Sequence, residues 1–241
     1  MAKKLLASVM AFALCLFVSA ADMVVKEKNG EDQKNNVVDQ SKTFLEFKVL
    51  SDSTVEVTIT PSYRGHKSIT IPEKVRIEGK VYTVTSIGYS AFRECRSLTS
   101  IKIPKGVTSI ADEAFYGCES LNSIKIPEGV TSIGGGAFYY CESLTSINIP
   151  EGVTSIGYAA FLGCKKLTSI NIPESVTSIG KCAFEGCSSL TSINIPGGLT
   201  SIGKEAFWGC YNLEIVIDNS EKKVKVGWNA FENCKSVKWL K

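Results

Sequence analysis

The fold is decided by a stretch that begins at residue 109 and reads SIADEAFYGCESLNSIKIPEGVT through residue 131. Closely related text recurs every 23 residues, and its copies begin at Ser86, Ser109, Ser132, Ser155, Ser178 and Ser201. Six cysteines keep this period without deviation, and they are Cys95, Cys118, Cys141, Cys164, Cys187 and Cys210. A unit this short cannot enclose a hydrophobic core by itself. The copies must therefore stack into a solenoid, whose function lies on a surface rather than in a pocket.

Each copy predicts one strand and one returning turn. In the second copy, residues 121–127 read LNSIKIP, where apolar residues alternate in period two and proline ends the run, as is typical of a short strand. One such strand per coil gives a parallel sheet. The segment AFYGC at residues 114–118 predicts about one helical or 3₁₀ turn on the other side. The predicted fold class is thus an α/β solenoid, with a parallel β-sheet on one face and short helical or 3₁₀ turns on the other.

A column of phenylalanines forms the expected spine of the core. Its members are Phe92, Phe115, Phe138, Phe161, Phe184, Phe207 and Phe231. Each buried aromatic ring removes roughly 150–250 Å² of surface from water. These residues are therefore interpreted as scaffold, with no functional role.

The cysteine column is expected to be reduced and buried, without a disulfide. Side chains in one column of a solenoid lie about 4.8 Å apart with parallel Cβ vectors, whereas a disulfide needs Cβ atoms about 3.8 Å apart and turned toward one another. A free cysteine packs as a small hydrophobe and can donate weakly to a neighbouring carbonyl. Cys182 stands in a variable column, so we expect it to be partly exposed and to react first with a thiol reagent.

Neither metal binding nor catalysis is indicated by the sequence. Zinc ligands occur at local spacings such as C-x₂₋₄-C, and only Cys182 with Cys187 approaches that spacing. His66 is the sole histidine, which argues against a Ser-His or Cys-His nucleophile. The glycines of residues 134–136 vary the repeat and do not form a phosphate-binding loop between a strand and a helix. We therefore expect no enzymatic activity, no cofactor and no metal.

Residues 1–21 have the pattern of a secretory signal peptide. Lys3 and Lys4 precede an apolar run at residues 5–18, and small residues follow at 19–21. We expect cleavage near Ala20–Ala21. The run of 14 residues is too short to span a membrane, and no second apolar stretch follows. The chain is therefore expected to be secreted or at the cell surface, with no transmembrane segment.

The rest of the chain divides into four segments. Residues 22–43 are polar and mixed in charge, and we expect a flexible lead there. Residues 44–85 contain two β-hairpin patterns and a worn first repeat, and they are expected to form the N-terminal cap that covers the core of the first coil. Residues 86–212 are the 23-residue repeats. Residues 213–241 are expected to form a degenerate repeat and a C-terminal cap.

The balance of charge argues against nucleic acid as a partner. The chain contains 27 Lys and Arg and 24 Asp and Glu. Loss of Lys3 and Lys4 with the signal peptide would leave 25 basic residues against the same 24 acidic ones. The sequence also shows no basic stripe with interleaved aromatic residues of the kind that marks many nucleic-acid-binding surfaces.

The expected sheet face presents two columns of polar side chains. Because Ile124 and Ile126 point inward, Ser123 and Lys125 must point outward. The serine column is Ser100, Ser123, Ser146, Ser169 and Ser192, and the second column is Lys102, Lys125, Asn148, Asn171 and Asn194. These ten side chains are candidates for binding an extended partner, a protein segment or a short glycan. The alternative is that they form hydrogen-bonded ladders that only keep the sheet soluble.

The returning turns carry a second candidate surface, the aromatic flank. It consists of Tyr116, Tyr140, Trp208 and Tyr211. Aromatic side chains of this kind often anchor interfaces. The alternative is that they fill grooves between adjacent coils.

The repeat text, L-x-x-I-x-I-P-x-x-V-x-x-I-G-x-x-A-F-x-x-C, resembles the treponemal-type leucine-rich repeats of the BspA-like surface-protein family. The resemblance covers about residues 44–241. It implies a right-handed leucine-rich repeat coil that begins with a hairpin-containing cap. It also implies adhesion, that is, recognition of host extracellular-matrix proteins, other microbes or host receptors.

The sequence and the resemblance together predict a secreted or cell-surface protein-binding or adhesion module that uses the outer faces of the solenoid. Its ligand is expected to be a protein of the host extracellular matrix or of another cell surface, with a glycan as a second ligand class. Two alternatives stay open. One is a self-associating structural surface protein, and the other is a carbohydrate-binding accessory protein.

Overall fold

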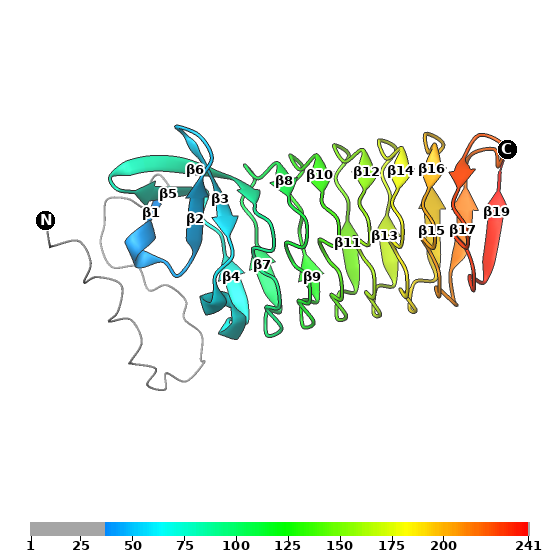
Figure 1. The fold of residues 1–241 in the computed structure, drawn as a ribbon, viewed down its shortest axis with the longest axis horizontal. Helices are drawn as coiled ribbons and strands as arrows, with labels where there is room; N and C mark the ends of the chain where they lie inside the picture. Colours follow the sequence, from blue (N-terminus) through cyan, green and yellow to red (C-terminus); the bar gives the residue numbers. More distant parts are fainter. Residues whose placement is uncertain (1–36, 241) are drawn as a thin grey trace, which may run out of the picture.

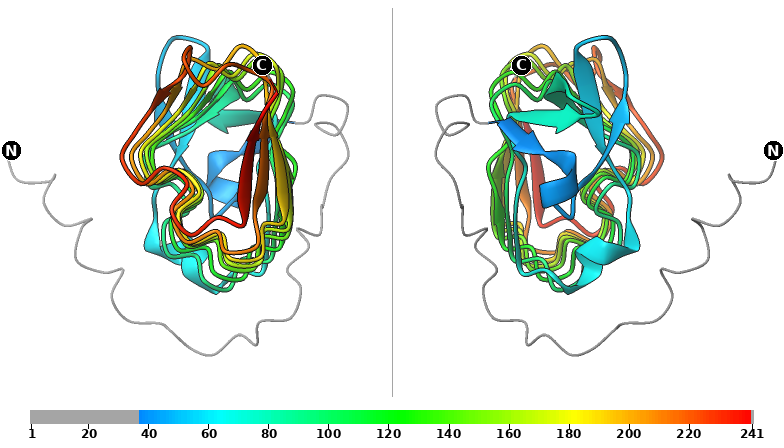
Figure 2. Two further views of the ribbon diagram at one scale, coloured as in Figure 1. Left: turned by 90° about the vertical axis from the view of Figure 1, so that its right-hand side faces the viewer. Right: turned by 90° about the vertical axis from the view of Figure 1, so that its left-hand side faces the viewer.

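The computed structural model describes residues 37–240 of the chain. These residues form an elongated stack of coils that advances along one axis from the N-terminal to the C-terminal end (Figure 1). Viewed along this axis, successive coils superimpose on one another (Figure 2). The predicted solenoid is confirmed. The predicted signal peptide, residues 1–21, and residues 22–36 of the expected lead lie outside the described residues.

Sheet B is the sheet that the sequence predicts from the LxxIxIP run. Its eight strands, in spatial order, are β4 (Ser68–Thr70), β7 (Ser100–Lys102), β9 (Ser123–Ile124), β11 (Ser146–Asn148), β13 (Ser169–Asn171), β15 (Ser192–Ile195), β17 (Glu214–Ile217) and β19 (Ser236–Trp239). All neighbouring pairs are parallel. The register places each repeat position opposite its own copy, as where Asn148 pairs with Asn171. The predicted parallel sheet is therefore confirmed.

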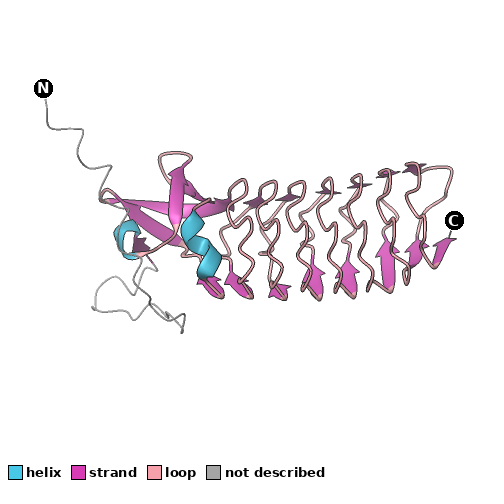
Figure 3. Cartoon of the chain, turned by 60° about the horizontal axis from the view of Figure 1, so that its bottom comes forward, coloured by secondary structure: helices cyan, strands magenta, loops and turns pink. Residues whose placement is uncertain are grey.

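Sheet A is a second sheet, which the sequence analysis did not predict. Its strands along the repeats are β6 (Lys80–Ile87), β8 (Ser109–Ile110), β10 (Ser132–Ile133), β12 (Ser155–Ile156), β14 (Ser178–Ile179), β16 (Ser201–Ile202) and β18 (Lys225–Val226). These strands are also parallel to one another, and they run along the side of the coils away from sheet B (Figure 3). A Ser-Ile pair is too short to show alternation, which explains why the pattern was missed.

The AFxxC segment of each repeat forms turns rather than a helix. Within residues 37–240, helix is confined to η2 (Gln40–Lys42) and η3 (Pro61–Gly65), both 3₁₀ and both before the regular repeats. In the second repeat, the amides of Tyr116 and Cys118 bond carbonyls three residues back, but the amide of Phe115 instead donates to Ala137 in the next coil at 2.8 Å. The prediction of helical turns is wrong, and the molecule is a β-solenoid rather than an α/β one.

These bonds to the next coil form the turn-side ladder, a third set of backbone contacts between coils. In the second repeat, Glu113, Phe115 and Gly117 donate to the following coil at 2.7–2.8 Å. The first and last of these donors have left-handed backbone angles in every coil, whatever the residue. Cys182 (φ 57°), Glu205 (φ 56°) and even Tyr140 (φ 55°) adopt this conformation. The left-handed region is costly for residues with a Cβ, so the ladder overrides local preference.

The glycines of the Ile-Gly step lie where the coils approach closely. A Cβ added to Gly157 would lie 3.0 Å from the carbonyl carbon of Gly134 in the preceding coil. These glycines do not have left-handed angles in the described chain. Close packing, rather than backbone freedom, therefore explains the column.

The segment before the regular repeats extends sheet A. Strand β1 (Val37–Asp39) runs parallel to β5 (Lys74–Ile77), and β5 pairs with β6 as an antiparallel hairpin. Strands β2 (Glu46–Val49) and β3 (Thr54–Thr58) form a second antiparallel hairpin, which joins β6 through β3. The expectation of a flexible lead up to residue 43 is wrong for β1 and the following η2, since both have regular structure.

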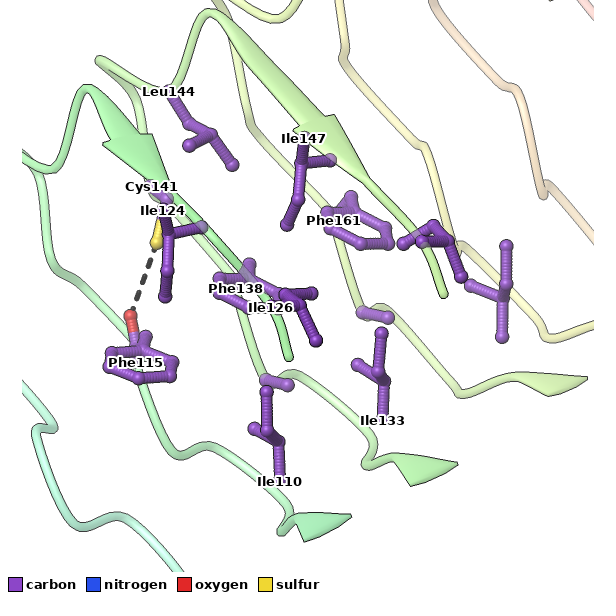
Figure 4. Close-up of a cluster of buried hydrophobic side chains, with 14 of the residues drawn as sticks. Ile110, Phe115, Ile124, Ile126, Ile133, Phe138, Cys141, Leu144, Ile147 and Phe161 are labelled. Carbon is purple, nitrogen blue, oxygen red and sulfur yellow. Dashed lines mark hydrogen bonds between the residues drawn. The ribbon is translucent and has the colours of Figure 1, made fainter. Parts of the chain in front are cut away.

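The aromatic column of the core is continuous from coil to coil. Neighbouring phenylalanine rings from Phe92 to Phe207 are stacked at centroid distances of 5.2–5.4 Å. Figure 4 shows three of them, Phe115, Phe138 and Phe161. Tyr63 of η3 adds to the N-terminal end at 5.2 Å from Phe92, and Phe231 adds to the C-terminal end at 6.0 Å from Phe207. The predicted spine is confirmed.

The cysteine thiols also bond from one coil to the next. Cys141 Sγ donates to the carbonyl oxygen of Phe115 at 3.2 Å (Figure 4). The equivalent bond is made by Cys118, Cys164, Cys187, Cys210 and Cys234. The predicted thiol-to-carbonyl contact is confirmed, and the eight described cysteines are free.

The segment after residue 212 adds further strands to both sheets. Strands β17 and β19 extend sheet B, and β18 extends sheet A. Trp239 lies on Phe231 with an edge-to-face ring contact of 6.5 Å. The aromatic column thus ends against a tryptophan of the final strand.

Replacement of Phe138 by alanine is expected to lower the free energy of unfolding by about 3–5 kcal/mol. Its ring is fully buried and lies 5.3 Å from both Phe115 and Phe161. Phe231→Ala should cost less, because that ring is partly exposed. Urea denaturation followed by circular dichroism measures both, and equal losses would contradict the shared-core account.

Candidate functional site

The outer face of sheet B presents all ten predicted side chains to solvent. The serine column and the Lys/Asn column are both exposed, and the isoleucines between them are buried. Serine lies opposite serine from β7 to β15. The alternation predicted from the sequence therefore places these residues on the outer face, as expected.

The asparagines of this face are not joined in a ladder. Within residues 37–240, the structure gives no hydrogen bond to the side-chain amides of Asn148, Asn171 and Asn194. Ser100 Oγ does bond Ser68 Oγ at 3.1 Å, at the N-terminal end of the sheet. The hollow over β11 and β13 measures about 320 Å³, which is near the lower end of the roughly 300–1,000 Å³ typical of small-ligand pockets. Its polar lining is Ser146, Asn148, Ser169 and Asn171.

The aromatic flank is only partly brought together. Arg93 lies 4.0 Å over the ring of Tyr116, which stacks at 4.8 Å on Tyr139. Tyr140 meets Tyr139 edge-to-face at 4.4 Å. Burial, together with the hydrogen bond to Tyr140, raises the pKa of Tyr139 to about 12. Tyr116 and Tyr140 thus belong to one cluster that spans adjacent coils.

The other two residues of the flank lie farther along the solenoid. Trp208 and Tyr211 belong to the coil that contains β16 and are both exposed. They do not join the tyrosine cluster formed by the earlier coils. The four predicted flank residues therefore do not form a single site.

Comparison with known proteins agrees with this architecture. The family model described as "BspA type Leucine rich repeat region" matches in six copies, over residues 65–168 and 154–241. The chain belongs to the BspA-type leucine-rich repeat family. No curated protein matches the sequence.

Solved structures of bacterial leucine-rich repeat proteins are similar to this BspA-type chain. The Leucine Rich Repeat protein of T. pallidum (TpLRR) has a TM-score of 0.71 and 30% identity, with coverage of 79% of this chain and 86% of that one. A leucine-rich repeat protein from Bacteroides ovatus has a TM-score of 0.62 and 28% identity, with coverage of 81% and 69%. A leucine rich cell surface protein from Faecalibacterium prausnitzii has a TM-score of 0.58 and 34% identity, with coverage of 73% and 53%. None of these descriptions names a catalytic activity.

The BspA-type repeats also bring together three possible metal ligands that local spacing did not reveal. Among the described residues, Cys182, Glu185 and Glu205 each offer one ligand atom, and these atoms lie within 4.8 Å of one another. Cys182 and Glu205 occupy the same repeat position one coil apart, so reading that column down the repeats would have found them. The structure contradicts the expectation that Cys182 is partly exposed, since it is 6% exposed.

The sole histidine lies in the first part of the described chain and has a packing contact. The ring of His66 stacks on that of Phe44 at 4.0 Å. Across residues 37–240, no helix is long and apolar enough to cross a membrane.

Cys234 is expected to react with a thiol reagent before Cys182 in the native protein. The thiolate is the reactive form. Burial raises the pKa of Cys234 to about 11, whereas burial and the adjacent Glu185 and Glu205 carboxylates raise the pKa of Cys182 to about 12. Cys234 is also the more exposed of the two. Mass spectrometry of timed labelling at about pH 8 measures the order, and faster labelling of Cys182 would contradict it.

Proposed function

We propose that this BspA-type solenoid is a secreted or cell-surface module that binds an extended segment of a protein partner on the outer face of sheet B. The observation that carries the proposal is the line of three exposed asparagine amides, which bond no other side chain among residues 37–240. If these amides were hydrogen-bonded to one another in a ladder, a role in stabilising the sheet would be enough to explain the asparagines. Free amides on parallel strands instead hold donors and acceptors at a constant interval for a partner.

The charge of the sheet-B face favours one orientation of that partner. Lys102 and Lys125 are exposed at the N-terminal end of the second column, and asparagines replace them in the later coils. Positive charge at one end of an otherwise neutral polar surface affects the register and the association rate of a bound partner more than its affinity. The proposal therefore includes an acidic group on the partner near β7 and β9.

The shape of the face fits an extended partner better than a small molecule. The hollow over β11 and β13 is shallow and open, and its floor is formed by Ile147 and Ile170. Interfaces between proteins commonly have such a flat apolar centre with a polar rim. The Faecalibacterium prausnitzii neighbour is described as a cell surface protein, which supports the same location for this chain.

The Lys102→Glu, Lys125→Glu double variant is expected to weaken capture by immobilised extracellular-matrix proteins. Both side chains are exposed, so thermal stability should change little, within about 0.5 kcal/mol for each surface change. Surface plasmon resonance against a panel of purified matrix proteins measures the binding, and the association rate should fall more than the dissociation rate rises.

A matched control reverses two lysines away from sheet B. Lys222 and Lys223 are exposed in the loop between β17 and β18, and their replacement by glutamate should leave capture unchanged. Equal loss in both double variants, or no capture of any matrix protein by the wild-type chain, would defeat the proposal. Light scattering over a concentration series completes the test, because growth in mass would favour self-association instead.

A further inference from the structure

A second line of residues, here called the row, follows sheet A on the turn side of the solenoid. It comprises the residue after the close-packed Gly or Ala in each successive coil. From the N-terminal end its members are Tyr89, Asp112, Gly135, Tyr158, Lys181, Lys204 and Trp228. None of them belongs to the sheet-B face or to the aromatic flank.

The backbone of the row is held by the turn-side ladder. The carbonyl of Tyr158 accepts from Gly136 at 2.7 Å, and that of Trp228 accepts from Glu205 at 3.0 Å. The intervening carbonyls of Lys181 and Lys204 accept in the same way at 2.9 and 3.0 Å. The row is therefore anchored at each coil, which lowers the entropy cost of presenting its side chains to a ligand.

The three aromatic residues of the row recur at every third coil. Tyr89, Tyr158 and Trp228 are 64%, 58% and 67% exposed. Three coils at strand spacing amount to roughly 14–15 Å. Aromatic anchors of protein interfaces gather in a well-packed centre, whereas these three are separated and evenly spaced along a line.

The positions between the aromatic residues differ along the row. Asp112 and Gly135 lie in the first interval, where Asp112 Oδ1 accepts from the amide of Gly135 at 2.7 Å. A shallow hollow of about 420 Å³ adjoins Tyr89 and Asp112 there. The only carboxylate of the row is thus occupied by a backbone donor, and the small residues leave space beside Tyr89.

The second interval is basic. Lys181 Nζ lies 5.9 Å over the ring of Tyr158, and Lys204 Nζ lies 4.8 Å over that of Trp228. Lys204 also pairs with Glu205 at 3.4 Å, with its own side chain about half exposed. Two lysine ammonium groups therefore lie between two exposed aromatic rings. The ammonium groups complement acidic groups on a ligand, and the aromatic rings complement apolar ring faces of the same ligand.

We propose that the row binds a linear polysaccharide whose pyranose units carry carboxylate or sulfate groups. The C–H groups on a pyranose face suit the electron-rich face of an aromatic ring, and lysine ammonium groups suit the acidic substituents. The even spacing of the three aromatic side chains along a line suits a linear chain of sugars rather than a single sugar. This site stands independently of the sheet-B proposal, because the two surfaces share no residue.

The test uses three linear acidic probes, polygalacturonate, alginate and heparin, together with fully methyl-esterified polygalacturonate as the uncharged counterpart. Affinity electrophoresis should show retardation by at least one acidic probe and little by the ester. Tyr158→Ala and Trp228→Ala should each weaken that binding by about tenfold or more. Lys181→Gln with Lys204→Gln should weaken it and reduce its dependence on salt.

Matched controls separate the row from general charge and aromatic exposure. Tyr211 is 60% exposed outside the row, so Tyr211→Ala should bind as the wild type does. Lys222→Gln with Lys223→Gln removes two exposed charges without touching the row. Circular dichroism checks that each variant remains folded. The proposal is overturned if no acidic probe binds, if the ester binds equally well, or if the control variants lose as much affinity as the row variants.

Discussion

The turn-side ladder is the constraint on which the rest of the molecule depends. In each coil it directs alternate amides into the next coil at 2.7–3.1 Å, and it holds two positions per coil in the left-handed region. Glu113, Ala159 and Cys182 all have this left-handed geometry, so any residue at this position must adopt it despite its conformational free-energy cost. The gain is a fixed register. Phenylalanine then meets phenylalanine, and each thiol meets the carbonyl of the coil before it.

All repeat positions share one register, so equivalent residues of successive coils are aligned on the surface of the solenoid. The 23-residue period turns residues that are far apart in sequence into neighbours, so variable positions become lines of side chains rather than scattered substitutions. Sheet B displays one such line of free amides, and the row displays another of aromatic and basic side chains. Stability is carried by the interior, so exterior positions can change with little effect on the fold.

Much of the fold could be predicted from the sequence, because the alternation of apolar and polar residues and the 23-residue repeat indicate which side chains are buried. Ile124 and Ile126 alternate with exposed residues, so the face of sheet B and its ten polar side chains followed. Sheet A did not follow, because each coil gives it only Ser-Ile. The left-handed columns are set by hydrogen bonds to the next coil, and Tyr140 gives no local sign of them. The proximity of Cys182 to Glu205 depends on the same contact between coils, which spacing within one repeat cannot reveal.

The most direct test of the shared register is to compare deletion of a whole coil with deletion of half a coil. Removal of residues 132–154 takes out one complete 23-residue unit, so each remaining strand, ring and thiol should meet an equivalent partner. Removal of residues 132–143 would bring a sheet-B segment against sheet A. Thermal unfolding followed by circular dichroism should show a cooperative transition only for the first deletion. A half-coil deletion that unfolds as cooperatively as the whole-coil one would contradict the account.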